Sequence, residues 1–285
     1  MRNQTILRVN GIDLCVETFG ARKDPAVLLI MGSSASMDWW RVDFCRRLAA
    51  GSRFVVRYDH RDTGRSVSYE PGAPGYTGED LVADAAALID SLDLGRAHLV
   101  GMSMGGALAQ LVALDHPDRV SSLTLISTSP ATPGSDDLDL PPMTEEATAR
   151  FAAVAAPDWR DRAAVIDYIV DLERACAGSR RFDEAEWREL AGRVFDRTTN
   201  IESALTNHDI LEDDDRRRAP LGTLKTPTLV IHGTDDPVLP HDHGRALARE
   251  IPGARLMTVE GMGHEVAPID WDVIVPAVLE HTATD

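Results

Sequence analysis

Cysteine is scarce in this 285-residue sequence, and the three present, Cys15, Cys45 and Cys176, are widely separated. An odd number of cysteines without C-x-x-C spacing indicates neither a disulfide framework nor a zinc site. None of the nine histidines belongs to an H-E-x-x-H pattern. We therefore expect reduced, buried thiols and no metal site.

Positive charge is also in deficit. Lys and Arg number 29 against 46 Asp and Glu, which gives a formal net charge of −17 at pH 7. Such a surface repels phosphate backbones and anionic lipid head groups, so neither nucleic acid nor a membrane is an expected partner. Solubility explains the acidic surface more simply than a role in steering substrates does.

Long hydrophobic runs are missing as well. Residues 1–6 lack the apolar stretch of about 7 to 15 residues that marks a signal peptide, and no window approaches the roughly 18 apolar residues of a membrane span. We expect a cytoplasmic protein. Its composition, 44% apolar and 26% charged, suits a globular chain with one large core and room for an insertion. The sequence leaves the oligomeric state open, a homo-oligomer included.

Short leucine-rich or β-branched runs alternate with amphipathic stretches through the first half and the last third of the chain. This alternation predicts an α/β fold, a mostly parallel sheet with helices on both faces. Asn10-Gly11, between two strand-like runs, predicts an opening hairpin. Eight strands are expected at 5–9, 12–19, 26–31, 54–58, 98–102, 120–126, 228–232 and 254–259. Helices are expected at 40–50, 79–92, 104–116 and 269–280.

The alternation stops between residues 129 and 220. This segment is rich in charge and helical in pattern, with candidate helices at 144–155, 159–177 and 183–196, and turn-forming residues flank it. We therefore predict a helical cap, residues 130–219, inserted after the sixth strand of a core made by 1–129 and 220–285. A cap there covers the carboxyl ends of the strands, where open parallel sheets bind ligands.

The strongest chemical signal is Gly101-Met102-Ser103-Met104-Gly105, which follows an apolar strand and precedes a helical run. Glycines two residues to either side of the serine remove side chains that would collide in a sharp strand-to-helix turn. Such a turn lifts the Ser103 hydroxyl above the sheet and aims the N-terminus of the next helix at the reaction centre. The five letters alone arise often by chance, so the flanking strand and helix are what favour a nucleophile.

A serine nucleophile needs a base, and the base needs an acid that orients it. The base candidate is His264, on the turn after the last strand, and the acid candidate is Asp236, on the turn after the preceding strand. Asp235 is the alternative acid. The order Ser, Asp, His is the one that a strand–turn–helix nucleophile requires. Three earlier histidines cannot serve as the base in that order: His60, His116 and His208.

Negative charge that develops on a substrate carbonyl needs two fixed donors. We expect the backbone N–H of Met104, directly after the nucleophile, and that of Ser33, in the loop after the third strand, where Gly32 permits close approach. An apolar pocket is expected beside them, lined by Gly32, Trp39, Met102, Phe151 and Trp159, with Trp40, Met104, Tyr168 and Trp187 as further candidates. For any single one of these side chains, a plain core role is favoured over a place in the pocket wall.

Together these residues resemble the α/β-hydrolase family over nearly the whole chain apart from the cap. The turn after the fourth strand places Asp62 where glycine is usual, and Met31-Gly32 stands where most members carry His-Gly. In both respects the chain is similar to the aclacinomycin methylesterases of anthracycline biosynthesis. The resemblance implies ester hydrolysis through an acyl-enzyme on Ser103, without cofactor or metal. It also implies that Asp59, Arg61 and Asp62 form a structural turn.

The resemblance implies a small apolar ester as substrate, such as the methyl ester of an aromatic polyketide. Lactonases and C–C bond hydrolases use the same triad, and the sequence does not separate them from a carboxylesterase. A dehalogenase is disfavoured because it needs an aspartate at position 103. Ligand-binding members of the fold commonly lose the triad histidine, which is present here. We therefore predict a serine esterase, with the other hydrolases as alternatives and a non-catalytic binding protein less favoured.

Overall fold

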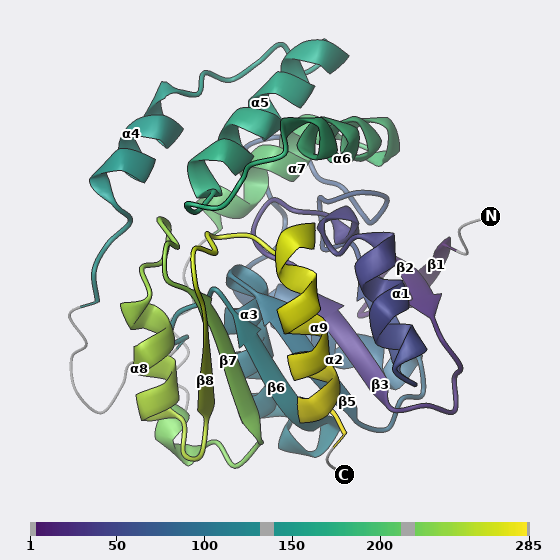
Figure 1. The fold of residues 1–285 in the computed structure, drawn as a ribbon. Coiled ribbons are helices and arrows are strands. Elements are labelled where there is room, and N and C mark those ends of the chain that lie inside the picture. The colour runs from purple at the N-terminus through teal and green to yellow at the C-terminus, as the bar shows by residue number, and fades with distance from the viewer. Residues whose placement is uncertain (1–3, 132–139, 212–219, 284–285) are drawn as a thin grey trace.

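Eight strands form one sheet in the computed structural model, which describes residues 4–131, 140–211 and 220–283 (Figure 1). The strand order is β1-β2-β4-β3-β5-β6-β7-β8. β2 pairs antiparallel with β1 and β4, and all other pairs are parallel. The predicted eight-stranded, mostly parallel sheet is confirmed. The strands are β1 (Gln4–Val9), β2 (Ile12–Phe19), β3 (Ala26–Ile30), β4 (Phe54–Tyr58), β5 (Ala97–Met102), β6 (Val120–Ile126), β7 (Thr228–Gly233) and β8 (Arg255–Val259).

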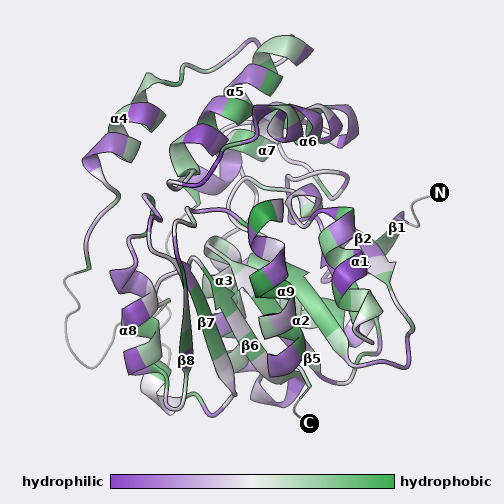
Figure 2. Cartoon of the chain, viewed as in Figure 1, coloured by the Kyte–Doolittle hydropathy of each residue, from purple (hydrophilic) through white to green (hydrophobic). Residues whose placement is uncertain are grey.

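Helices cover both faces of this sheet. One face carries α1 (Val42–Ala50) and α9 (Trp271–His281). The other carries α2 (Gly78–Ser91), α3 (Met104–Asp115) and α8 (Asp242–Glu250). Figure 2 shows the hydrophobic colour concentrated in the central strands between these layers. Within the described ranges, no helix has the length and apolar character needed to cross a membrane.

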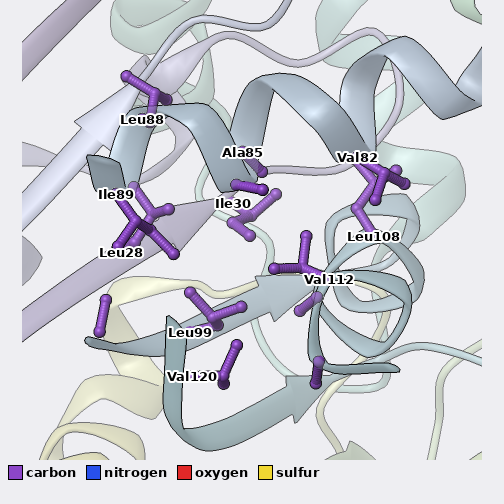
Figure 3. Close-up of a cluster of buried hydrophobic side chains, with 14 of the residues drawn as sticks. Leu28, Ile30, Val82, Ala85, Leu88, Ile89, Leu99, Leu108, Val112 and Val120 are labelled. Carbon is purple, nitrogen blue, oxygen red and sulfur yellow. The ribbon is translucent and has the colours of Figure 1, made fainter. Parts of the chain in front are cut away.

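The central strands are buried on both faces, and their residues alternate between two apolar layers. Figure 3 shows Leu28 and Leu99 of the sheet in one cluster with Ile89 of α2 and Val112 of α3. The neighbouring residue Val27 belongs to the opposite layer, beneath α1 and α9. Because both faces of a strand are apolar, these segments appear in the sequence as continuous hydrophobic runs rather than alternating ones.

In the described part of the segment between β6 and β7, four α-helices sit over one end of the sheet (Figure 1). They are α4 (Glu145–Ala153), α5 (Arg162–Cys176), α6 (Glu184–Arg197) and α7 (Ile201–Thr206). We call α4 to α7 the cap helices. The sequence predicts the first three and misses α7, which is a six-residue helix too short to show an amphipathic period. The border proposed at residue 219 lies outside the described residues.

A buried ion pair joins the cap helices to the core. Arg197, at the end of α6, donates from Nη1 and Nη2 to the carboxylate of Asp59 at 2.6 Å each, and from Nε to Asp38. Asp59 is fully buried and also accepts the backbone N–H groups of Met37 and Arg65. Burial lowers the pKa of Arg197, but the hydrogen bonds and charges of the two aspartates outweigh it and raise that pKa. Arg197 is therefore charged in the folded protein.

Replacing Arg197 by Met should lower the free energy of unfolding by about 3 to 5 kcal/mol, because Asp59 then stays buried without its charged partner. Urea denaturation followed by circular dichroism measures the loss. Arg162→Met is the matched control: the Arg162–Asp196 pair has side chains 51% and 58% exposed, and solvent screens it, so its removal should cost far less stability than the loss of Arg197. Equally small losses in both variants would contradict a stabilising role for the buried pair.

Candidate active site

Ser103 lies between β5 and α3 in a strained turn. Its φ of 52° and ψ of −124° lie in a region that side-chain-bearing residues avoid. Backbone hydrogen bonds fix the turn. The N–H of Ser103 donates to the carbonyl of Ile126 in β6, and the carbonyl of Ser103 accepts the N–H of Gly106. Gly105 has no room for a side chain, because a Cβ there would lie 2.2 Å from the carbonyl oxygen of Ile30. The structure thus has the strand–turn–helix that the glycine spacing predicts.

His264 and Asp236 are joined by a buried hydrogen bond. His264 Nδ1 lies 2.9 Å from Oδ2 and 3.1 Å from Oδ1 of Asp236. The same carboxylate accepts the backbone N–H groups of Val238 and Leu239, at 3.0 and 2.9 Å. Burial raises the pKa of Asp236, but the charge of His264 and hydrogen bonds from His264 and His232 outweigh it and hold that pKa well below its usual range. The charged carboxylate therefore holds His264 with Nδ1 toward the acid.

Asp235, the alternative acid, does not contact His264 among the described residues. Its Oδ1 accepts the hydroxyl of Thr234 at 2.7 Å. Hydrogen bonds from Ser179 and Thr234 lower the pKa of Asp235. The carboxylate beside the imidazole is therefore that of Asp236, and Asp235 belongs to the neighbouring surface.

The cap helices hold the loop that carries His264. The backbone N–H of His264 donates to the carbonyl of Cys176, at the end of α5, at 2.8 Å. Two glycines meet backbone to backbone here: a Cβ on Gly263 would lie 2.1 Å from the nitrogen of Gly178, and one on Gly178 would lie 2.4 Å from the oxygen of Gly261. Close approach of two chains therefore requires these glycines. The sequence held no signal for the contact, because its two sides are far apart along the chain.

Ser103 and His264 line one cavity of about 450 Å³ beneath the cap helices. Within the described chain no hydrogen bond joins Ser103 to His264, so the two share this wall without being bonded to each other. Seven of the residues expected from the sequence line the cavity: Gly32, Ser33, Trp39, Met102, Phe151, Tyr168 and Trp187.

Trp159 does not line the cavity, and the structure corrects that expectation. Its ring stands edge-on to the ring of Tyr168, with 5.4 Å between centroids, so it supports the cavity wall from behind. Trp40, one of the further candidates, stacks on Phe44 at 5.5 Å in the layer beneath α1. An aromatic side chain in the sequence does not reveal whether it faces a cavity or backs one.

Two backbone donors lie next to Ser103. Gly32 packs against the serine closely enough that a Cβ on it would lie 3.2 Å from Ser103 Cβ, and Ser33 follows it in the cavity wall. Met104 begins α3 directly after the nucleophile. In the part of the chain that the structure describes, no protein acceptor pairs with the N–H of Ser33 or Met104. Two unused donors beside a nucleophile are what an oxyanion hole requires.

His208, just after the cap helices, holds the loop that carries Ser33. Its Nδ1 accepts the N–H of Ser34 at 2.9 Å, and its Nε2 donates to the carbonyl of Arg61 at 2.9 Å. Burial and the nearby His60 lower the pKa of His208 to about 4, so the ring is neutral at pH 7 and can accept. Chain order excludes His208 as the base, and the sequence offered no signal for this supporting role.

Gly105→Ala should lower the free energy of unfolding by about 3 kcal/mol or more, because the new methyl group meets the backbone of β3 rather than a side chain that can move. Thermal unfolding measures the effect. In Gly222→Ala the added Cβ meets only Glu250 O, at 3.8 Å, and stability should change by less than about 0.5 kcal/mol. A Gly105→Ala protein as stable as the wild type would contradict the packing described for this turn.

His208→Asn should flatten the fall of stability at acid pH. The pKa of His208 is about 4 in the folded chain against an ordinary 6.5, so its neutral form stabilises fully above pH 6.5, and that stability is lost as pH falls toward 4. Asn can accept the Ser34 N–H and does not titrate. Between pH 6.5 and 4.5 the slope of unfolding free energy should shrink by up to about 1.4 kcal/mol per pH unit. Urea titrations at several pH values test this; parallel profiles would contradict a neutral ring.

Comparison with known proteins shows the family of the chain. The family model described as "Serine aminopeptidase, S33" matches residues 21–268. The rhodomycin D methylesterase DauP of Streptomyces sp. (strain C5) is 32% identical over 289 residues, and DnrP of Streptomyces peucetius, of the same description, is 33% identical over 292; each alignment covers 95% of both chains.

Among solved structures, the enol-lactonase from Burkholderia xenovorans LB400 superimposes with a TM-score of 0.75 at 25% identity, over 98% of this chain and all of that one (100%). The fold, the family model and the methylesterase relatives agree on one assignment. The resemblance predicted from the motifs is confirmed, and the chain belongs to the serine hydrolases of the α/β-hydrolase family.

Proposed function

We propose that this protein hydrolyses carboxylic esters through an acyl-enzyme on Ser103. The observation that carries the proposal is the hydrogen bond between His264 and the buried carboxylate of Asp236, in a cavity that Ser103 also lines. An imidazole oriented in this way can take the proton of a serine hydroxyl. The methylesterase relatives support esters as the substrate class.

In the proposed reaction, Ser103 Oγ attacks the ester carbonyl carbon while His264 Nε2 takes its proton. The carbonyl oxygen becomes negative and accepts from the N–H groups of Ser33 and Met104. His264 then gives the proton to the departing alcohol. Water, deprotonated by His264, attacks the acyl-enzyme and releases the acid and free serine. Asp236 stays charged and stabilises the imidazolium in both halves.

The proposed substrate is a small apolar ester, such as the methyl ester of an aromatic polyketide. Two relatives are named as rhodomycin D methylesterases, and aromatic rings in the cavity wall suit a flat acyl group. We place the protein in the cytoplasm. We expect neither nucleic acid nor a membrane as a partner, because a net charge of −17 disfavours binding to either.

Lactone hydrolysis is the second candidate, favoured by the similarity to the enol-lactonase. The same nucleophile and base open a cyclic ester without any change in mechanism. A screen of p-nitrophenyl esters of graded acyl length, a macrolactone and an anthracycline methyl ester separates esterase from lactonase by the preferred substrate. A folded protein that hydrolyses none of them and never reacts with a fluorophosphonate probe would be a binding protein instead.

Ser103→Ala should lower kcat by on the order of 10⁶, and His264→Ala by about as much, because members of the triad act as a unit. Asp236→Asn should cost about 10⁴ by favouring the wrong tautomer of His264. Asp235→Asn is the matched control and should leave kcat within about twofold, since Asp235 does not contact the imidazole. A silent Asp236→Asn beside a crippled Asp235→Asn would overturn the assignment of the acid.

A further inference from the structure

The wall of the catalytic cavity is partly polar. Its titratable side chains include Arg41 at the start of α1, Glu173 in α5 and Glu265 directly after His264, which come from separate elements. All three line the cavity that Ser103 and His264 also line. The mechanism uses none of them.

Arg41 has a donor without a partner. Its guanidinium stacks over the ring of Trp187, at 5.2 Å, and Nη1 lies 3.7 Å from a carboxylate oxygen of Glu186, beyond hydrogen-bond distance. Nη2 is buried, and no described residue accepts a hydrogen bond from it. A buried donor left without an acceptor destabilises the protein, so this nitrogen is suited to an acceptor that a ligand brings.

Glu173 is held in place by Trp39, whose Nε1 donates to Oε1 at 2.7 Å, and no described residue donates a hydrogen bond to its second oxygen. Burial raises the pKa of Glu173 to about 7 and that of Glu265 to about 8, although Arg41 opposes both shifts. No ion pair joins Arg41 to either glutamate in the described chain. The cavity wall therefore combines a cationic donor, Arg41, with the carboxyl groups of Glu173 and Glu265. Whether protonated or ionised, a carboxyl group can form a hydrogen bond with a hydroxyl of the ligand.

We propose that Arg41 and Glu173 form a subsite for a hydroxyl group on the aryl acyl part of the substrate. A phenolic hydroxyl satisfies both sides, because its oxygen accepts from Arg41 Nη2 and its proton is shared with the free oxygen of Glu173. The apolar remainder of the cavity takes the ring. This inference rests on the proposed ester hydrolysis and narrows it to hydroxyaryl esters.

The test compares methyl 2-naphthoate with its monohydroxy isomers in wild type and Arg41→Met, which keeps an apolar stem of similar length. In wild type at least one hydroxy isomer should have a kcat/KM at least about tenfold above the parent ester, the value of one charged hydrogen bond. Arg41→Met should abolish that ratio. Arg46→Met, an exposed arginine of the same helix with a side chain 69% accessible, is the control and should keep it. A ratio that is absent in wild type, or unchanged in Arg41→Met, would refute the subsite.

Binding to a Ser103→Ala protein, followed by calorimetry, separates this inference from the proposed function. The favoured hydroxy ester should bind at least about tenfold more tightly than the parent, and adding Arg41→Met should remove the difference. Selective binding without any hydrolysis by wild type would support the hydroxyl subsite and refute the proposed esterase activity. Hydrolysis that depends on Ser103, with equal binding of both esters, would support the esterase activity and refute the subsite.

Discussion

The buried carboxylate of Asp59 ties together three parts of the molecule. It accepts the N–H of Met37 in the loop that leads to α1, the N–H of Arg65 in the turn after β4, and both Nη atoms of Arg197 from the cap. Because a charge in that position is stable only with all its donors in place, the turn, the loop and the cap must dock together. The cavity exists only between parts docked in this way.

Asp62, a few residues later, is a second carboxylate that joins separate segments of the chain by hydrogen bonds. Its φ of 67° lies in the left-handed region, where glycine is the usual residue and an aspartate costs about 1 kcal/mol. The carboxylate offsets that strain by accepting from Tyr76 Oη at 2.7 Å and from Asn207 Nδ2 at 2.9 Å. The departure from glycine at this position thus has a structural reason, an anchor for the segment that carries His208.

The sequence predicts the features that depend on patterns within a short stretch of chain. Apolar runs and glycine spacing are sufficient for the sheet, the opening hairpin and the turn at Ser103, and chain order points to His264 and Asp236. What the sequence misses depends on partners far along the chain, such as Gly178 against Gly263 or His208 against Ser34. The sequence predicts Trp159 in the cavity wall, which is wrong, because residue type alone does not distinguish a side chain in the wall from one in the layer behind it.

The cap touches the catalytic centre at two backbone positions, through Cys176 to His264 and through His208 to Ser34. A module that only selected substrates would be free to diverge throughout its length. This one carries two short stretches whose geometry the chemistry itself depends on, while the helices between them line the cavity and bind the core through the Arg197–Asp59 pair. Recombination between relatives should therefore exchange specificity without loss of turnover only when both stretches travel with the helices, which makes them the natural crossover limits for building chimaeric enzymes on this core.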